Sequence, residues 1–215
     1  MDKLMLAENG LLTNQEKELY RTLRTNVEFT GIENKVIAVT SCMPDDGKTT
    51  VSFQLASAFA ENGKKTVYID ADLRKSVFSQ RYNVKGNPKG ISHYLSGQAP
   101  LTEVLYKTNK ERFGQMLEEF KKIFDYIIID TPPLGNVIDA AVIAKKCDAS
   151  MLVLTSDKCS RGFAKGVVTQ LKNANPNFLG VVLNKVDMKG KSYYGHTYKS
   201  YYGKGYHASG SGFDK

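Results

Sequence analysis

The residues of this chain with the clearest chemical potential form a short loop between an apolar run and an amphipathic one. The segment 40–50 reads TSCMPDDGKTT and follows a β-branched, apolar run. In such a turn, N–H groups at a helix start bind phosphate oxygens, a lysine reaches the outer phosphates and a hydroxyl ligates Mg²⁺. Lys48 and Thr49 fit the last two roles, although Cys42 replaces the first glycine of the usual GxxxxGK[ST] pattern. The predicted nucleotide-binding residues of this loop are Pro44, Asp45, Asp46, Gly47, Lys48, Thr49 and Thr50.

Three aspartates at the ends of two further apolar runs extend this site. Asp70 ends one run and Asp72 follows two residues later, on the same side of the chain, while Asp130 ends another run at the position typical of a Walker B aspartate. A lone aspartate there is usually a turn former, and GKT can arise by chance, but together these features favour phosphoryl transfer. We predict Lys48, Asp70 and Asp72 as catalytic residues and Thr49, Asp72 and Asp130 as metal ligands. Which of Asp70 and Asp72 accepts a proton is left open.

A dense group of tyrosines supplies a candidate acceptor for the phosphoryl group. Residues 188–215 contain six of the twelve tyrosines, six glycines and five lysines against one aspartate, a net +4 of the formal +8. This composition buries too little apolar surface to offset the entropy of ordering, so we expect a disordered tail after a domain of residues 1–187. A low-complexity tail without a chemical role is the alternative. The predicted phosphoacceptors are Tyr193, Tyr194, Tyr198, Tyr201, Tyr202 and Tyr206.

Alternating apolar and amphipathic runs predict the scaffold that positions these residues. The short apolar runs are typical of parallel strands buried on both faces, and the runs between them have helical periodicity. We expect an α/β, P-loop NTPase-like fold, in which a mostly parallel sheet is flanked by helices and binds its ligand at the carboxyl ends of the strands. The expected strands are 35–40, 65–70, 126–130, 150–155 and 178–184, and the expected helices are 14–29, 49–62, 112–124, 138–145 and 162–173.

The composition is that of a globular protein. Hydrophobic residues make up 41% of the 215 residues, and no apolar run approaches the ~20 residues that span a bilayer. The first residues lack the apolar segment of a secretory signal. The cysteines are three in number and lack metal-ligand spacing, which is typical of reduced thiols in the cytoplasm. No catalytic role is expected for the isolated histidines His93, His196 and His207.

The phosphate loop, the aspartate-ended strands and the tyrosine cluster together resemble the bacterial protein-tyrosine kinases of capsular and exopolysaccharide loci. The similarity extends over about residues 14–206 and is strongest to the separate cytoplasmic type of Gram-positive bacteria. The resemblance implies ATP and Mg²⁺ as cofactors and autophosphorylation of the terminal tyrosines. It also implies that Asn184, at the end of the run 178–184, lies near adenine.

The resemblance further implies assembly and partners. The family carries an E-x-x-R-x-x-R motif that packs subunits into a ring, and Glu18, Arg21 and Arg24 match it. Without the resemblance, these residues would be interpreted as a solvated charge ladder. A transmembrane polysaccharide co-polymerase as activator and a cognate tyrosine phosphatase are implied as well. The expected location is cytoplasmic, at the inner face of the membrane through the membrane partner.

The chain departs from the family pattern at two places. Only residues 107–111 connect two helical patterns where the family usually has a strand and a P-x-N-P loop, so we expect one strand fewer. The segment 74–76, Arg-Lys-Ser, lacks the proline common after that arginine.

Three other functions fit parts of the sequence. A positioning ATPase of the ParA/MinD type shares the fold, but its second lysine in the phosphate loop is replaced here by Met43. The segment 184–187, NKVD, matches the guanine reader of GTPases, but no DxxG switch motif accompanies it. A nucleic-acid or membrane-surface binder would use the +8 charge, half of which lies in the tail. No nucleic-acid-binding signature is present, so no nucleic acid partner is expected.

Overall fold

The computed structural model describes residues 12–72 and 110–186, and the chain divides after Asn184 into two units, of which the first is described below. Its five strands form one parallel sheet in the order β2-β3-β1-β4-β5. Each strand agrees with an expected one within a single residue, so the predicted α/β fold is confirmed. The strands are β1 (Val36–Ser41), β2 (Thr66–Asp70), β3 (Tyr126–Asp130), β4 (Ala149–Thr155) and β5 (Phe178–Asn184).

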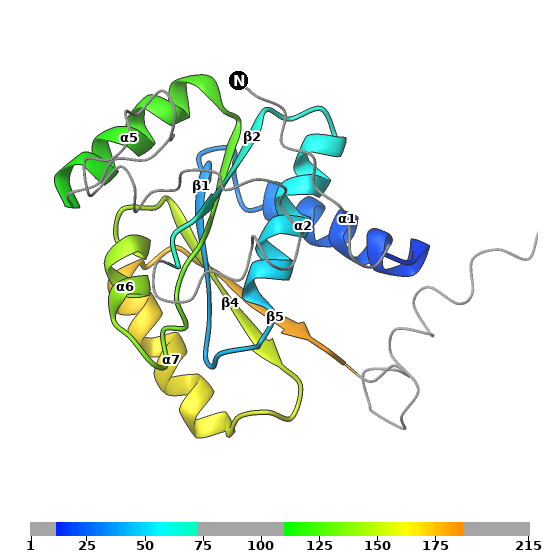
Figure 1. Cartoon of the computed structure of the whole chain (residues 1–215), viewed down its shortest axis with the longest axis vertical. Coiled ribbons are helices and arrows are strands. Elements are labelled where there is room, and N and C mark those ends of the chain that lie inside the picture. Colours follow the sequence, from blue (N-terminus) through cyan, green and yellow to red (C-terminus); the bar gives the residue numbers. More distant parts are fainter. Residues whose placement is uncertain (1–11, 73–109, 187–215) are drawn as a thin grey trace, which may run out of the picture. The chain divides into compact units, whose positions relative to one another are not determined.

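Helices cover both faces of the sheet, and their ends lie within two residues of the expected ones. On one face lie α1 and α2, blue and cyan in Figure 1, and on the other lie α5, α6 and α7, green to yellow. Local capping explains two of the starts: Thr13 and Glu16 form a capping box before α1, and the Ser160 hydroxyl accepts from the N–H of Phe163 before α7. The helices are α1 (Asn14–Glu28), α2 (Lys48–Glu61), α5 (Lys110–Ile123), α6 (Asp139–Ala144) and α7 (Arg161–Ala174).

The central strand β1 joins the two hydrophobic layers because its side chains alternate between them. Ile37 and Val39 pack with Leu55 of α2, whereas Ala38, which lies between them, packs with Leu171 of α7. All five of these side chains are almost fully buried. Such burial on both faces is the reason why the strand is a continuous apolar run rather than an alternating one.

The edge strand β5 departs from the expected burial. Val181 and Leu183 expose 47% and 40% of their surface, so the prediction that this run is buried on both faces is wrong. The physical reason is the position of the strand: among the strands of the described ranges, β5 pairs only with β4 and lies at the edge of the sheet. The apolar sequence of an edge strand does not show which of its two faces lacks a covering helix.

Several predictions concern residues outside the described ones. These are the tail at 188–215 with its tyrosines, the domain boundary after residue 187, and residues 107–109 of the short connection, whose last two residues, Lys110 and Glu111, lie in α5. Within the described ranges, none of the helices combines the length and the apolar character needed to cross a membrane.

Candidate active site

The candidate site lies where the carboxyl ends of β1, β2 and β3 meet. Val39 of β1 and Asp70 of β2 both pair in register with Asp130 of β3. The loop that follows β1 therefore begins beside both aspartates. Parallel strands of this register bring together residues that lie far apart in the sequence, as expected for the carboxyl edge of such a sheet.

The phosphate loop has a backbone that glycine alone fits at its last position. Gly47 has a φ of +89° and directly precedes α2, so the loop leads into the N-terminus of this helix, the end that favours anions. A Cβ at this position would lie 2.2 Å from Nδ2 of Asn184. Asp45 also has a positive φ, 62°, and is exposed. The loop thus has the strained geometry typical of a phosphate cradle.

Asp46 stabilises this loop from the inside. Its Oδ2 accepts from the N–H of Met43 at 2.8 Å, and its carbonyl accepts from Nδ2 of Asn184 at 2.9 Å. The side chain is buried, with 1% of the residue exposed. The loop motif predicts Asp46, and the family resemblance predicts Asn184, as nucleotide-binding residues. The structure brings both to the loop, where the Asp46 carboxylate and the Asn184 amide each bind a part of the loop backbone.

The first residue of the loop lies under it rather than toward a ligand. Cys42 is fully buried in the layer below α6 and α7. Burial, followed by the neighbouring Cys159 and Asp46, raises the pKa of the Cys42 thiol to about 12. A Cβ at Gly135, after β3, would lie 2.1 Å from the Cys42 carbonyl. The replacement of glycine by Cys42 is accommodated because its side chain enters the core.

Lys48 lies at the centre of the site, between two carboxylates. Its Nζ is 2.8 Å from Oδ2 of Asp72 and 3.6 Å from Oδ1 of Asp130. The Thr49 hydroxyl donates to Oδ2 of Asp130 at 2.6 Å. Asp70 joins indirectly, because its Oδ1 accepts from the N–H of Asp72 at 3.0 Å. The structure therefore brings together all five residues predicted as catalytic or metal-binding.

Asp130 has an unusual protonation equilibrium. The pKa of its carboxyl is raised to about 7, chiefly by burial. Lys48 and the Thr49 hydrogen bond act in the opposite direction and lower the pKa, while the negative charges of Asp70 and Asp72 add to the increase. Its carboxyl therefore exchanges a proton near neutral pH. A cation bound at this place would favour the ionised carboxylate.

The oxygen atoms of the site fit a magnesium ion that is shared with phosphate. No group of three or more His, Cys, Asp or Glu side chains in the described ranges could hold a metal alone. Mg²⁺ in phosphoryl-transfer sites takes one or two carboxylates, a hydroxyl and phosphate oxygens instead. Oδ1 of Asp130 is buried without a hydrogen-bond partner, and Thr49 and Asp72 contact the same Lys48–Asp130 pair. This donor set matches the ion.

Two side chains reach the site without having been predicted. The Tyr68 hydroxyl donates to Oδ2 of Asp130 at 3.4 Å, and the Lys158 ammonium contacts the phosphate loop. Tyr68 lies two residues before Asp70 and so on the same side of β2, a spacing that could have indicated it. For Lys158, which follows β4, the sequence offers no comparable signal.

The predicted assembly motif lies on α1 and differs in burial along its length. Glu18 and Arg21 form an exposed ion pair at 2.5 Å. The Arg24 side chain is 18% exposed; it is paired with Glu28 at 3.6 Å, and its Nη1 donates to the Ala58 carbonyl of α2 at 3.5 Å. The motif thus contributes to the packing of α1 on α2 as well as to the surface.

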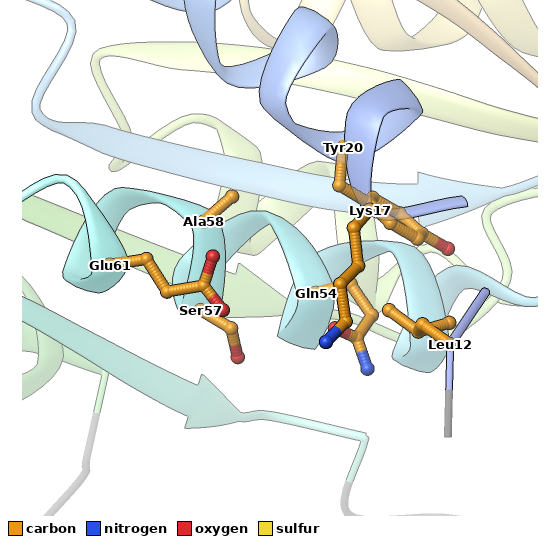
Figure 2. Close-up of a pocket in the computed structure, with 7 residues that line it drawn as sticks. All are labelled: Leu12, Lys17, Tyr20, Gln54, Ser57, Ala58 and Glu61. Atoms are coloured by element: carbon orange, nitrogen blue, oxygen red, sulfur yellow. The ribbon is translucent and has the colours of Figure 1, made fainter. Parts of the chain in front are cut away.

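A small hollow between α1 and α2 is not the nucleotide site. Figure 2 shows Lys17 of α1 beside Gln54 of α2, with Glu61 further along α2. Its volume is about 50 Å³, far below the several hundred Å³ typical of a ligand pocket. The residues that line it are Leu12, Lys17, Tyr20, Gln54, Ser57, Ala58 and Glu61.

The fold and site define a P-loop nucleotide-binding protein, and comparison with known families agrees. Residues 37–202 match the CobQ/CobB/MinD/ParA nucleotide binding domain. The tyrosine-protein kinase CpsD of Streptococcus pneumoniae serotype 4 is 40% identical over an alignment that covers 90% of this chain and 95% of that protein. The chain therefore belongs to the bacterial tyrosine-protein kinases.

Solved structures support the same family. The kinase domain of the Escherichia coli tyrosine kinase ETK superposes with a TM-score of 0.73 at 30% identity, over 82% of this chain and 78% of that one. The septum site-determining protein MinD of Pyrococcus horikoshii, solved with Mg-ADP, gives a TM-score of 0.60 at 23% identity, over 74% and 72%. The second likeness shows the fold alone, so the MinD-type alternative is not favoured.

Proposed function

We propose that this tyrosine kinase transfers the γ-phosphoryl group of ATP to tyrosine hydroxyls and that the six tyrosines at 193–206 are its own acceptors. The observation that carries the proposal is the buried Lys48 between Asp72 and Asp130, beside Thr49. A lysine, a hydroxyl and carboxylates at the end of a phosphate loop are the parts that phosphoryl transfer requires. The family supplies the acceptor class, and the local excess of tyrosine supplies the candidate acceptors.

Each side chain has a distinct task in this mechanism. Lys48 would move from its carboxylate partners to the outer phosphates, while the N–H groups after Gly47 hold the inner ones. Thr49, Asp72 and Asp130 would hold Mg²⁺. The ion neutralises charge on the phosphate oxygens when it is bound.

One carboxylate of the pair Asp70 and Asp72 would accept the proton of the attacking hydroxyl. Tyrosine has a pKa near 10, so a carboxylate within reach assists the loss of its proton. Asp70 and Asp72 are candidates; the Asp70 side chain orients Asp72 through the N–H of that residue. Asp72 contacts Lys48 directly and is also a proposed metal ligand. We assign the proton to this pair without choosing between them.

The proposed assembly and partners rest on the family resemblance. Glu18, Arg21 and Arg24 would contact a neighbouring subunit in a ring, which would bring the tail of one subunit to the site of the next. A transmembrane polysaccharide co-polymerase would activate the kinase at the inner face of the membrane, and a tyrosine phosphatase would reverse its action. The process so regulated would be the synthesis and export of capsule or exopolysaccharide.

Mass spectrometry after incubation with ATP and Mg²⁺ tests the proposal. The full chain is incubated with and without the cytoplasmic end of a candidate activator, and phosphate is mapped to individual tyrosines. We expect phosphate at one or more of Tyr193 to Tyr206 and little steady release of inorganic phosphate. Unmodified tyrosines alongside continuous ATP hydrolysis would contradict the kinase proposal and favour a MinD-type ATPase.

A further inference from the structure

Lys158 is a charged residue at the phosphate loop that none of the motifs includes. Its Nζ lies 3.4 Å from Oδ1 of Asp46 and donates a hydrogen bond to the Pro44 carbonyl. The Lys158 side chain is 34% exposed, whereas that of Asp46 is 2% exposed. One ammonium thus contacts both a buried carboxylate and the backbone of the loop that cradles phosphate.

The turn that presents Lys158 is held at both ends. Asp157 has a φ of 57°, and the N–H of Lys158 donates to the Thr155 carbonyl at 3.4 Å, which closes a tight turn after β4. The N–H of Ser156 donates to the Asn184 carbonyl at 3.0 Å and ties the turn to β5. On the other side, Ser160 caps α7. Lys158 therefore extends from a fixed backbone position rather than from a long loop.

Asp46 is the reason why a cation is needed here. It immediately precedes Gly47 and Lys48, so its charge lies close to the place where phosphate oxygens would bind. Oδ2 accepts from Met43, but Oδ1 is buried and accepts no hydrogen bond from the described residues. A buried carboxylate without a nearby cation is costly and would repel a polyanion. The Lys158 ammonium supplies the compensating charge.

Ends of three strands thus converge on one residue of the loop. The loop itself follows β1, Asn184 ends β5 and donates to the Asp46 carbonyl, and Lys158 follows β4 and pairs with the Asp46 carboxylate. We propose that Lys158 is a positioning residue for nucleotide binding, which neutralises Asp46 and fixes the Pro44 carbonyl so that the loop N–H groups face the phosphates. The inference rests on the proposed nucleotide site.

A double-mutant cycle tests whether Lys158 acts through Asp46. The dissociation constant of ATP with Mg²⁺ is measured by calorimetry for Lys158→Met, Asp46→Asn, the double variant and the wild type. We expect Lys158→Met alone to weaken ATP binding about tenfold, the size expected of one charge-assisted contact. On the Asp46→Asn background the same change should cost no more than about twofold, because the charge to be neutralised is gone. Equal effects on both backgrounds, or none on either, would overturn the proposal.

Two further variants separate positioning from general loss of structure. Lys165→Met removes an exposed lysine of α7, outside the contacts of the loop, and should leave ATP binding unchanged. Lys158→Arg keeps the charge and the donors and should restore binding to within about threefold of the wild type. A KM for ATP that rises in Lys158→Met while kcat stays within about twofold identifies a role in binding. A loss of kcat with KM unchanged would overturn it.

The outcome can be distinguished from failure of the proposed kinase function. If the wild type binds ATP but no tyrosine is phosphorylated, the kinase proposal fails and the cycle at Lys158 still decides the inference. If the tail is phosphorylated and Lys158→Met binds ATP as tightly as the wild type, the inference fails and the kinase proposal stands.

Discussion

Two charged clusters of this chain contain similar side chains in opposite surroundings. At the carboxyl edge of the sheet, Lys48, Asp72 and Asp130 are buried, and the Lys48 ammonium lies within 3.6 Å of both carboxylates. On α1, Glu18 and Arg21 form an ion pair whose side chains are 64% and 50% exposed. Water screens the second pair and leaves it little net energy, whereas the first cannot lose a member without leaving a buried charge.

Burial therefore distinguishes a candidate catalytic cluster from a surface ion pair better than residue type does, since both contain the same kinds of charged side chain. Buried charged side chains lie here beside a phosphate loop. The desolvation of the Asp130 carboxylate by burial is the main reason why its pKa is raised. The pair of Glu18 and Arg21 on α1 is exposed to solvent, so its predicted role in assembly depends on a neighbouring subunit.

Substitution at Asp130 is expected to have a large effect on the rate of phosphoryl transfer. Asp130→Asn keeps the shape of the side chain but removes the charge that would hold Mg²⁺ beside Thr49. We expect the rate of tyrosine phosphorylation to fall on the order of 10²–10³-fold, the size typical of losing one charge-stabilising group. Glu119→Gln, which changes an exposed carboxylate of α5, should leave the rate unchanged. Equal rates in the two variants would remove Asp130 from the proposed metal site.

Addition of a methyl group to the phosphate loop comes next. Gly47→Ala places a Cβ 2.2 Å from Nδ2 of Asn184 at a φ of +89°, and we expect ATP binding to weaken by at least about tenfold. Gly162→Ala is the matched control, because nothing lies within 4 Å of the added atom. Calorimetry with ATP reads both variants. Normal binding by Gly47→Ala would show that this backbone is not needed for phosphate.

The pH dependence of magnesium binding follows from the pKa of Asp130, about 7. Below that pH the carboxyl is protonated and must release a proton before it can hold the ion. The apparent affinity for Mg²⁺ should therefore rise up to about tenfold per pH unit on approach from the acid side and level off above the pKa. Titration of ATP-dependent heat against Mg²⁺ at pH values on both sides measures it. A flat profile would show that Asp130 is not a ligand.

The smallest effects are expected on α1, where the two arginines differ. Arg24→Ala removes a mostly buried side chain from the Ala58 carbonyl and should lower the free energy of unfolding by about 1–2 kcal/mol. Arg21→Ala removes an exposed partner and should lower it by less than about 0.5 kcal/mol. Urea unfolding at a fixed protein concentration compares them. An equal loss would mean that burial does not rank the two residues.

Much of this site could be predicted because its residues lie at strand ends. Lys48, Asp70 and Asp130 each follow or end an apolar run, and a parallel sheet brings the carboxyl ends of its strands to one edge. The fold was predictable for the same reason, since each strand is a short run between turn residues. The local sequence is therefore sufficient to place these strands along the chain.

Other features depend on tertiary convergence that spacing does not encode. Lys158 reaches Asp46 only because β4 lies beside β1 and a turn with positive φ follows it. The burial of Arg24 depends on the angle at which α1 packs on α2, and the same three-residue spacing leaves Arg21 exposed. The exposed face of β5 likewise depends on which helices cover the sheet.

The rate of tyrosine phosphorylation in Lys48→Met tests whether the site at Lys48 transfers phosphate to the tyrosines at 193–206. The full chain and this variant are incubated with ATP, Mg²⁺ and activator, and phosphotyrosine at residues 193–206 is followed by mass spectrometry over time, with Lys165→Met as the control. We expect phosphotyrosine in the wild type and in Lys165→Met, and a rate of phosphorylation at least about 10³-fold lower in Lys48→Met. Phosphorylation by Lys48→Met at the wild-type rate would contradict it.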